Sequence, residues 1–166
     1  IGEGRDFEEV RKYLRAVDHG VGSAIGAARG PIGLIGIGEL PAAYKAVSAM
    51  PYLIKEVNRK DPAGAGPAEV RAVADQLLAQ HRCDAADALH SRIGDLVGAG
   101  KASTNLQAIV GAALKGRVEA VLFGPDRGGN ESAVNTAVLA TLRGRGDVME
   151  HPALTPAQPA AALFRY

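Results

Sequence analysis

The longest regular pattern in the sequence is a run of helical spacing from Ala68 to about Val97. Pro67 suits a first helical position, and the glycines of Gly98-Ala-Gly100 are typical of residues that follow a last turn. Apolar residues recur at helical spacing through the run, at Val70, Val73, Leu77, Ala85, Leu89, Ile93 and Leu96. This pattern predicts one long helix. We interpret the helix as the connector between two modules, over residues 1–80 and 81–166.

The sequence before this helix predicts a small α/β module. Helical spacing over 7–18 predicts a first helix, with Asp6 as its N-cap and a preceding glycine-rich turn at Gly2–Arg5. The apolar run 32–37 predicts a buried strand, because a strand of a parallel sheet is covered on both faces. A helix over about 41–49 and a strand over 52–58 are expected to complete the module.

The sequence after the connector alternates helices and strands. We expect a helix capped by Ser103 or Thr104 that runs to Leu114, and a second helix over 130–142. Strands are predicted at 118–123, 147–150 and 160–164. Strands that alternate with helices favour parallel pairing and right-handed crossovers. The predicted fold class is therefore α/β, with two small three-layer modules joined by the long helix.

Composition narrows the classes of function. Hydrophobic residues make up 47% of the chain, with no Trp, three Phe and four Tyr, which favours close helix–sheet packing over an aromatic-lined cofactor cavity. The net charge of +1 lacks the basic excess of a protein that holds nucleic acid by charge alone, so any RNA contact must be local. The single cysteine, Cys83, excludes an internal disulfide and fits a cytoplasmic protein. No run of ~18 apolar residues predicts a membrane span.

The sequence does not complete any cofactor-binding or metal-binding motif, and we predict neither a cofactor nor a metal ion. Pro41 occupies the third glycine position of a dinucleotide fingerprint that would start at Gly36, and Ala102 replaces the hydroxyl residue of a P-loop. The histidines lack the spacing of metal ligands and are interpreted as solvated or capping residues; they are His19, His81, His90 and His151. The carboxylates of the connector are interpreted as its soluble outer face; they are Asp75, Asp84 and Asp87.

Two segments of the second module carry a family resemblance. The stretch 100–106, Gly-Lys-Ala-Ser-Thr-Asn-Leu, is followed by 113–123, Ala-Leu-Lys-Gly-Arg-Val-Glu-Ala-Val-Leu-Phe, and by the closing Ala-Ala-Ala-Leu-Phe-Arg-Tyr at 160–166. These segments resemble the C-terminal domain of archaeal and eukaryotic release factors and Pelota. In the first module, 9–15 is similar to the basic helix after the family's Gly-Gly-Gln loop. The resemblance implies a central domain followed by a C-terminal domain of the kink-turn-binding ribosomal protein type, in the bacterial branch of the superfamily.

The resemblance also implies partners and contact residues. A translation-associated protein of this type docks on the ribosome, tRNA or rRNA, and its C-terminal domain can bind a translational GTPase. The RNA-contact candidates are Gly2, Gly4, Arg5, Arg11, Lys12 and Arg15. The partner-docking candidates are Thr104, Asn105, Leu106, Asp126 and Arg127.

Departures from the family pattern change the expected function. The turn that matches Gly-Gly-Gln reads Gly2-Glu3-Gly4, without the glutamine that acts on peptidyl-tRNA, and the chain opens at Ile1 without a codon-reading domain, so we expect further sequence upstream. Ribosome rescue, dormancy or regulation is therefore expected rather than stop-codon termination, and no self-contained active site is predicted. Two alternatives stay open: an RNA-binding or nuclease-like enzyme on the same scaffold, and an interaction scaffold with no RNA role.

Overall fold

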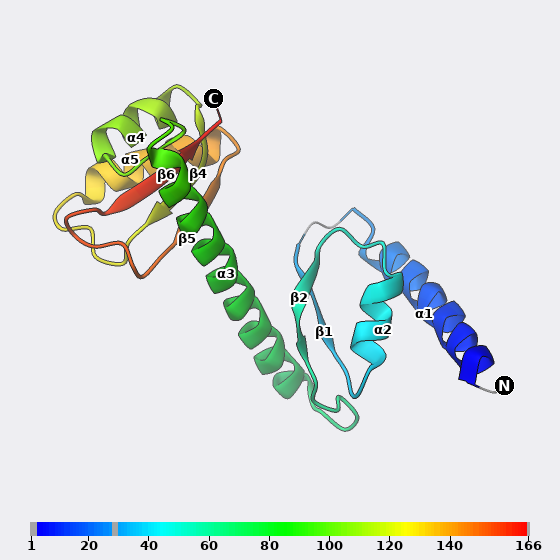
Figure 1. The fold of residues 1–166 in the computed structure, drawn as a ribbon. Helices are drawn as coiled ribbons and strands as arrows, with labels where there is room; N and C mark the ends of the chain where they lie inside the picture. Colours follow the sequence, from blue (N-terminus) through cyan, green and yellow to red (C-terminus); the bar gives the residue numbers. More distant parts are fainter. Residues whose placement is uncertain (1–2, 28–29, 166) are drawn as a thin grey trace. The chain divides into compact units, whose positions relative to one another are not determined.

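The computed structural model describes residues 3–27 and 30–165, with side chains from residue 8 onwards in that part of the chain. Its contacts divide into two compact units, Ile1–His81 and Arg82–Tyr166. The helix α3 (Pro67–Val97) contributes to both units (Figure 1). Its bounds agree with the predicted connector to within one residue. None of the helices in the described residues is long and apolar enough to cross a membrane.

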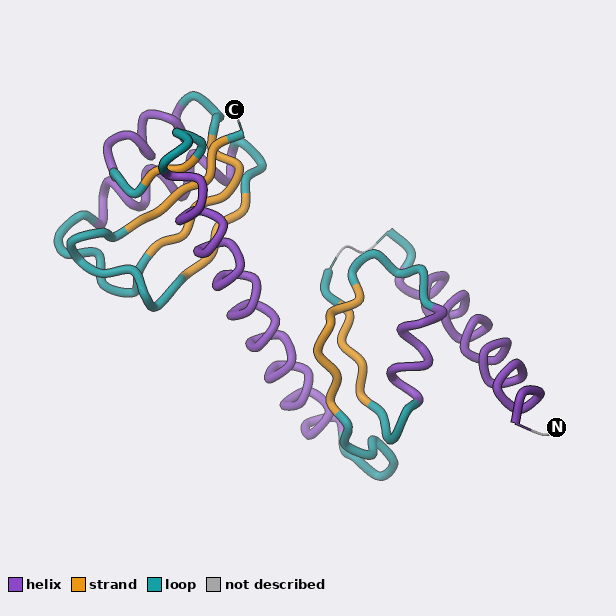
Figure 2. Tube along the Cα trace, viewed as in Figure 1, coloured by secondary structure: helices purple, strands orange, loops and turns teal. Residues whose placement is uncertain are grey.

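The first unit has a two-stranded parallel sheet between helices. Its elements are α1 (Glu3–Ile25), β1 (Ile32–Ile35), α2 (Leu40–Val47) and β2 (Leu53–Asn58), with β1 paired parallel to β2. One face of the sheet packs on the first half of α3, where Ile54, Val73 and Leu77 form a buried cluster. The other face carries α2 and α1 (Figure 2). The unit therefore has the three layers that the sequence predicts.

The second unit has a four-stranded sheet in the order β3-β6-β4-β5. Its elements are β3 (Ala102–Ser103), α4 (Leu106–Leu114), β4 (Val118–Phe123), α5 (Glu131–Arg143), β5 (Asp147–Glu150) and β6 (Ala160–Phe164). The second half of α3 packs on one face through Ala86, Leu89 and Ile93. The helices α4 and α5 pack on the other face through Ile109, Ala113, Val134 and Ala137. This unit is also three-layered, and the predicted fold class is confirmed.

Small side chains let these layers approach closely. Ala160 and Ala162 of β6 belong to the cluster under α4 and α5, whereas Ala161 and Leu163 belong to the cluster under α3. This alternation is the two-residue period of a strand covered on both faces. All four residues are at most 1% exposed. The close helix–sheet packing that the composition predicts is confirmed.

Two predictions about helix starts are wrong. α1 begins at Glu3, so Glu3–Arg5 lie in a helix rather than in a glycine-rich turn, and Asp6 is inside the helix instead of capping it. A lone glycine costs a helix only about 1 kcal/mol, which the good helix formers around it offset. The cap of α4 is Asn105, whose Oδ1 accepts the backbone N–H of Ala108 at 3.1 Å. Ser103 does not take this role because it pairs in β3 with Ala162.

The prediction of parallel pairing holds for only part of the second sheet. β4 and β5 are parallel, but β6 runs antiparallel to both β4 and β3. The physical reason is the connection: residues 151–159 form a loop without a helix, and such a short return without a crossover favours an antiparallel strand. This reversal decides which residues meet at each end of the sheet.

We predict that Gly146 is required for the packing of α5 on the sheet. A Cβ at this position would lie 2.6 Å from Thr141 Cγ2 and 2.8 Å from the carbonyl oxygen of Glu119. Gly146→Ala should therefore lower the free energy of unfolding by about 1–3 kcal/mol in urea denaturation followed by circular dichroism. The matched control is Gly94→Ala in α3, where nothing lies within 4 Å of the added Cβ. The control should be about 0.5–1 kcal/mol more stable than the native protein, and equal destabilisation by both variants would contradict the prediction.

Candidate functional site

The predicted RNA contacts map to one helix. Arg11, Lys12 and Arg15 are exposed on α1, and the Arg11 guanidinium lies 3.7 Å from the carboxylate of Glu8 one turn before it. Of the other candidates, Gly4 lies within α1, whereas Gly2 and the side chain of Arg5 lie outside the described residues. The structure therefore brings three cations together on one helix, with one of them partly neutralised by Glu8.

A partly buried set of hydrogen bonds fixes the position of this helix. Asp18 accepts hydrogen bonds from Ser48 Oγ at 2.5 Å, Tyr44 Oη at 2.9 Å and the backbone N–H of Ala49 at 3.2 Å. The Ser48 hydrogen bond is the largest of the effects that lower the pKa of Asp18, and burial opposes it. Burial raises the pKa of the Tyr44 hydroxyl, and its hydrogen bond to Asp18 adds to the shift. Asp18 thus ties α1 to the end of α2, and so orients the three cations.

An open apolar groove of about 680 Å³ lies between α1, β1 and α2. Leu14 and Tyr44 are buried at its floor, whereas Ile37 and Leu40 are about half exposed at its rim. The predicted strand over 32–37 ends at Ile35 in the structure, and this earlier end leaves Ile37 at the surface. The groove is an apolar surface that the sequence pattern did not reveal.

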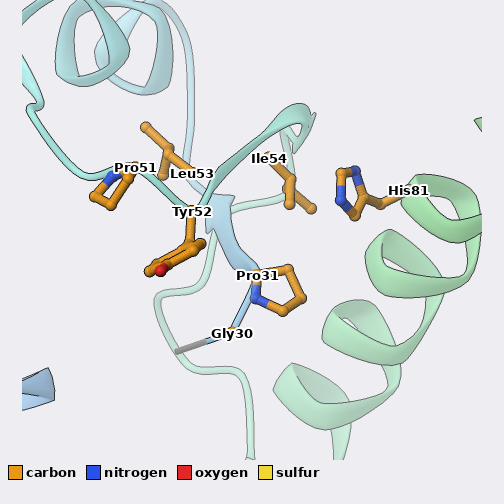
Figure 3. Close-up of a pocket in the computed structure, with 7 residues that line it drawn as sticks. All are labelled: Gly30, Pro31, Pro51, Tyr52, Leu53, Ile54 and His81. Carbon is orange, nitrogen blue, oxygen red and sulfur yellow. The ribbon is translucent and has the colours of Figure 1, made fainter. Parts of the chain in front are cut away.

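Two smaller hollows flank the first sheet. One, of about 360 Å³, is lined by three basic residues that the sequence analysis did not group: Lys45, Lys55 and Arg59. Lys45 Nζ also donates a hydrogen bond to the carbonyl oxygen of Lys55. The other hollow, of about 430 Å³, is drawn in Figure 3, where the side chains of Ile54 and His81 face each other. His81 Nδ1 lies 3.5 Å from a carboxylate oxygen of Glu56.

The predicted partner-docking residues gather at one end of the second sheet. Thr104, Asn105 and Leu106 open α4, and α4 runs antiparallel to β4, so they lie near the end of β4 from which the loop of Asp126 and Arg127 departs. Asp126 Oδ1 accepts the backbone N–H of Gly128 at 3.0 Å. The Arg127 guanidinium lies 5.1 Å from the centre of the Phe123 ring and donates to Asn135 Oδ1 at 3.1 Å. These contacts give the loop a defined shape.

One histidine is a structural residue that the sequence analysis misassigned. His151 is 4% exposed, rather than solvated, and its Nε2 lies 2.9 Å from Asp87 Oδ1. The backbone N–H of Ala153 donates to Nδ1 at 3.2 Å, so neutral His151 carries its proton on Nε2 and donates it to Asp87. The ring of His90 stacks on His151 with centroids 4.4 Å apart. Asp87 therefore holds the loop after β5 against α3 and is more than a solubilising carboxylate.

The arrangement of this cluster differs from that of a metal centre. Within residues 3–27 and 30–165 no group of three or more His, Cys, Asp or Glu side chains is arranged to hold a metal ion. The His90–His151 contact is a stack of two rings, which turns their faces rather than their nitrogens toward each other. The cluster thus positions the loop after β5.

Solved structures share this fold. A structure of ribosome-bound archaeal Pelota with ABCE1 is 18% identical, covers 93% of this chain and 49% of its own, and has a TM-score of 0.60. A crystal structure of Archaeoglobus fulgidus Pelota is 15% identical, with coverage of 93% and 54% and a TM-score of 0.48. The chain spans about half the length of these structures. None of the curated proteins matches its sequence. The order and layering of the elements are those of a Pelota-like α/β fold.

The sequence profile of bacterial archaeo-eukaryotic release factor family 3 matches residues 2–117, which is more than two thirds of the chain. The chain belongs to this family. The match runs through the α1 helix with its three cations and through the whole of α3 and α4. The predicted membership of the bacterial branch of the release factor and Pelota superfamily is confirmed.

We predict that Asp18 stabilises the first unit at neutral pH and that this stabilisation is lost at acidic pH. Its pKa is lower in the folded than in the unfolded state, so its contribution is fully present above the unfolded value of about 4 and is lost as the pH falls through the folded value. Asp18→Asn should lower the free energy of unfolding at neutral pH by about 1–3 kcal/mol and reduce its dependence on pH below about 4. Glu9→Gln, at an exposed position of α1, is the control for urea denaturation across this pH range. A variant as acid-sensitive as the native protein would exclude this role of Asp18.

Proposed function

We propose that this protein is a translation-associated factor that docks on the ribosome or on ribosome-bound RNA. Its role is in ribosome rescue, dormancy or regulation rather than in termination at stop codons. The observation that carries the proposal is the family match over residues 2–117 together with a Pelota-like order of elements through both units. In this proposal the first unit corresponds to the central domain of the family and the second unit to its C-terminal domain.

The basic face of α1 supplies the RNA contact of the proposal. Arg11, Lys12 and Arg15 are exposed on a helix that Asp18 and Leu14 hold in place, and long cationic side chains on a fixed helix suit phosphate oxygens. Glu8 weakens this face, because its carboxylate lies beside Arg11 and repels phosphate. The contact is therefore local and moderate in strength, in keeping with the small net charge of the chain.

The residue types at the start of the chain support a role outside termination. The positions that resemble the Gly-Gly-Gln turn read Gly2-Glu3-Gly4, and a carboxylate does not replace the glutamine amide beside a peptidyl-tRNA ester. The catalytic chemistry of peptide release is accordingly not part of the proposal.

The end of the second unit that holds Thr104–Leu106 and the loop of Asp126 and Arg127 is the proposed docking site of a protein partner. The defined loop, with Arg127 packed on Phe123, presents a fixed surface. A translational GTPase is the proposed partner class, by analogy with the family. The archaeal Pelota structure shows Pelota bound to the ribosome together with ABCE1. This supports the proposal of a factor that acts on the ribosome with a second protein.

We predict that the purified full-length protein co-sediments with ribosomes or ribosomal subunits in sucrose gradients. The variant Arg11→Gln, Lys12→Gln, Arg15→Gln should bind roughly tenfold more weakly, a loss of about 1.4 kcal/mol, because it loses phosphate contacts. The matched control is Lys60→Gln, Arg71→Gln, Arg82→Gln, which removes the same charge at exposed positions away from α1.

The outcomes separate the parts of the proposal. Native protein that never co-migrates with ribosomes or subunits at low salt would overturn the proposed function. Equal weakening of both triple variants would assign the binding to overall charge and remove α1 as the contact.

A further inference from the structure

One end of the second unit carries a row of basic residues, one beside each strand. Lys101 directly precedes β3, Arg165 directly follows β6, Arg117 directly precedes β4, and Arg145 lies two residues before β5. In the sheet order β3-β6-β4-β5 these four residues therefore follow one another in a row across one end of the sheet. All four are exposed. The row lies at the end of the sheet where β6 stops, beside the marked C-terminus in Figure 1.

Backbone hydrogen bonds confirm that neighbours in the row are adjacent. The N–H of Phe164 donates to the carbonyl oxygen of Lys101 at 2.8 Å, and the N–H of Arg165 donates to that of Arg117 at 3.0 Å. The Arg165 guanidinium reaches across to the carbonyl oxygen of Gly144 at 2.7 Å, next to Arg145. Residues far apart in the sequence are thus brought together in one row of basic residues.

Two more cations lie behind this row. Lys115 follows the last residue of α4, and Arg143 is the last residue of α5. Both helices run antiparallel to β4, so their C-terminal ends lie at the same end of the sheet as the row. Both side chains are exposed. Six of the nine Lys and Arg residues of 82–166 therefore gather at this end.

Most acidic residues of the unit lie elsewhere. Asp126, Glu131 and Glu150 lie at the other ends of β4, α5 and β5, and Asp87 binds His151 there. The acidic residues at the basic end are Asp147, which opens β5, Asp95 in the last turn of α3, and Glu119 near the start of β4. Glu119 is bound to Arg92 of α3 at 3.0 Å. The unit is nearly neutral in total, but its charge is segregated between its two ends.

Helix capping accounts for only part of this arrangement. Basic side chains at the C-terminal ends of helices stabilise the helix dipole, which explains Lys115 and Arg143 without any ligand. Lys101 and Arg117 also follow helix ends, since their backbone N–H groups donate to the carbonyl oxygens of Leu96 and Ala112 at 3.2 and 3.0 Å. Arg165 instead follows a strand, and sheets have only small net dipoles. Each helix end explains its own cation, but not the position of all four residues in one row.

The backbone at Arg145 gives a second, independent sign. Among the residues that the structure describes, Arg145 is the one non-glycine residue with a positive φ, which is 57°. It stands between Gly144 and Gly146, in a conformation that glycine adopts at far lower cost. Strain of this kind is typical of functional positions, where the side chain matters more than the backbone energy.

We propose that the row of Lys101, Arg165, Arg117 and Arg145, supported by Lys115 and Arg143, binds the phosphate backbone of RNA. Neighbouring strands are ~4.8 Å apart, so the strand ends that carry these four cations lie next to one another. A row of several cations matches the repeated phosphates of a nucleic acid strand better than it matches one small anion. The inference rests on the proposed function only for the source of the RNA, which is the ribosome, and it adds a second RNA contact on the C-terminal unit.

The test measures binding of a short fluorescein-labelled single-stranded RNA of mixed sequence to the full chain by fluorescence anisotropy. Potassium chloride is varied between about 50 and about 200 mM. The row variant is Lys101→Gln, Arg145→Gln, and the matched control is Arg71→Gln, Arg82→Gln, which removes the same charge from exposed positions of α3. We expect the row variant to bind at least roughly fivefold more weakly and to have a log–log salt slope smaller by about 1.4, whereas the control stays near the native values.

A second variant separates binding from folding. Arg145→Gly should keep or raise the melting temperature, because glycine relieves the positive φ, and should still weaken RNA binding. A merely structural Arg145 would leave RNA binding unchanged in this variant.

Several results would overturn the inference: no RNA binding at low salt, equal binding by the row and control variants, or equally strong competition by polyglutamate, which would indicate an acidic protein partner. The result is also distinguishable from failure of the proposed function. RNA binding that depends on the row, without co-sedimentation with ribosomes, would leave the inference standing and remove only the ribosome as the source of the RNA.

Discussion

The second unit depends on the burial of β6 between two helical layers. Its alanines are small enough for α3 to pack closely on one face and for α4 and α5 to pack on the other. The residues from Ala160 to Leu163 are at most 1% exposed. Larger residues in a strand paired on both sides would force the layers apart or strain the core. The low aromatic content of the chain is the compositional side of this packing.

The direction of β6 then decides the chemistry of each end of the sheet. Because β6 returns antiparallel to β4, its last residues lie beside the first residues of β4, and Arg165 meets Arg117. A parallel β6 would have placed Arg165 near Glu150 and the loop after β4, where it would have been neutralised. One loop without a helix, from His151 to Pro159, thus separates a basic end from an acidic one.

The sequence was sufficient where local pattern decides structure. The bounds of β4, β5 and β6 follow directly from short apolar runs between turn residues, and α3 follows from its long helical period. Pairing direction, the cap of α4 and the His151–Asp87 contact depend on residues distant in the chain, and no local pattern encodes them. The resemblance to release factors identified the family, yet it drew attention to the basic helix α1 and away from the strand ends.

Charge shows the same limit most clearly. The net charge of the chain is nearly zero, which argues against binding to nucleic acid. A net charge does not say where the charges lie, whereas electrostatic attraction acts over roughly a Debye length of ~8–10 Å. At the end of the sheet that carries the row, six cations outnumber Asp147, Asp95 and Glu119, so a phosphate strand there encounters a positive surface. Under the two proposals, the opposite ends of one small sheet serve different partners, RNA at the basic end and a protein at the end of Asn105 and Arg127. Because the ends do not overlap, both partners can be bound at once.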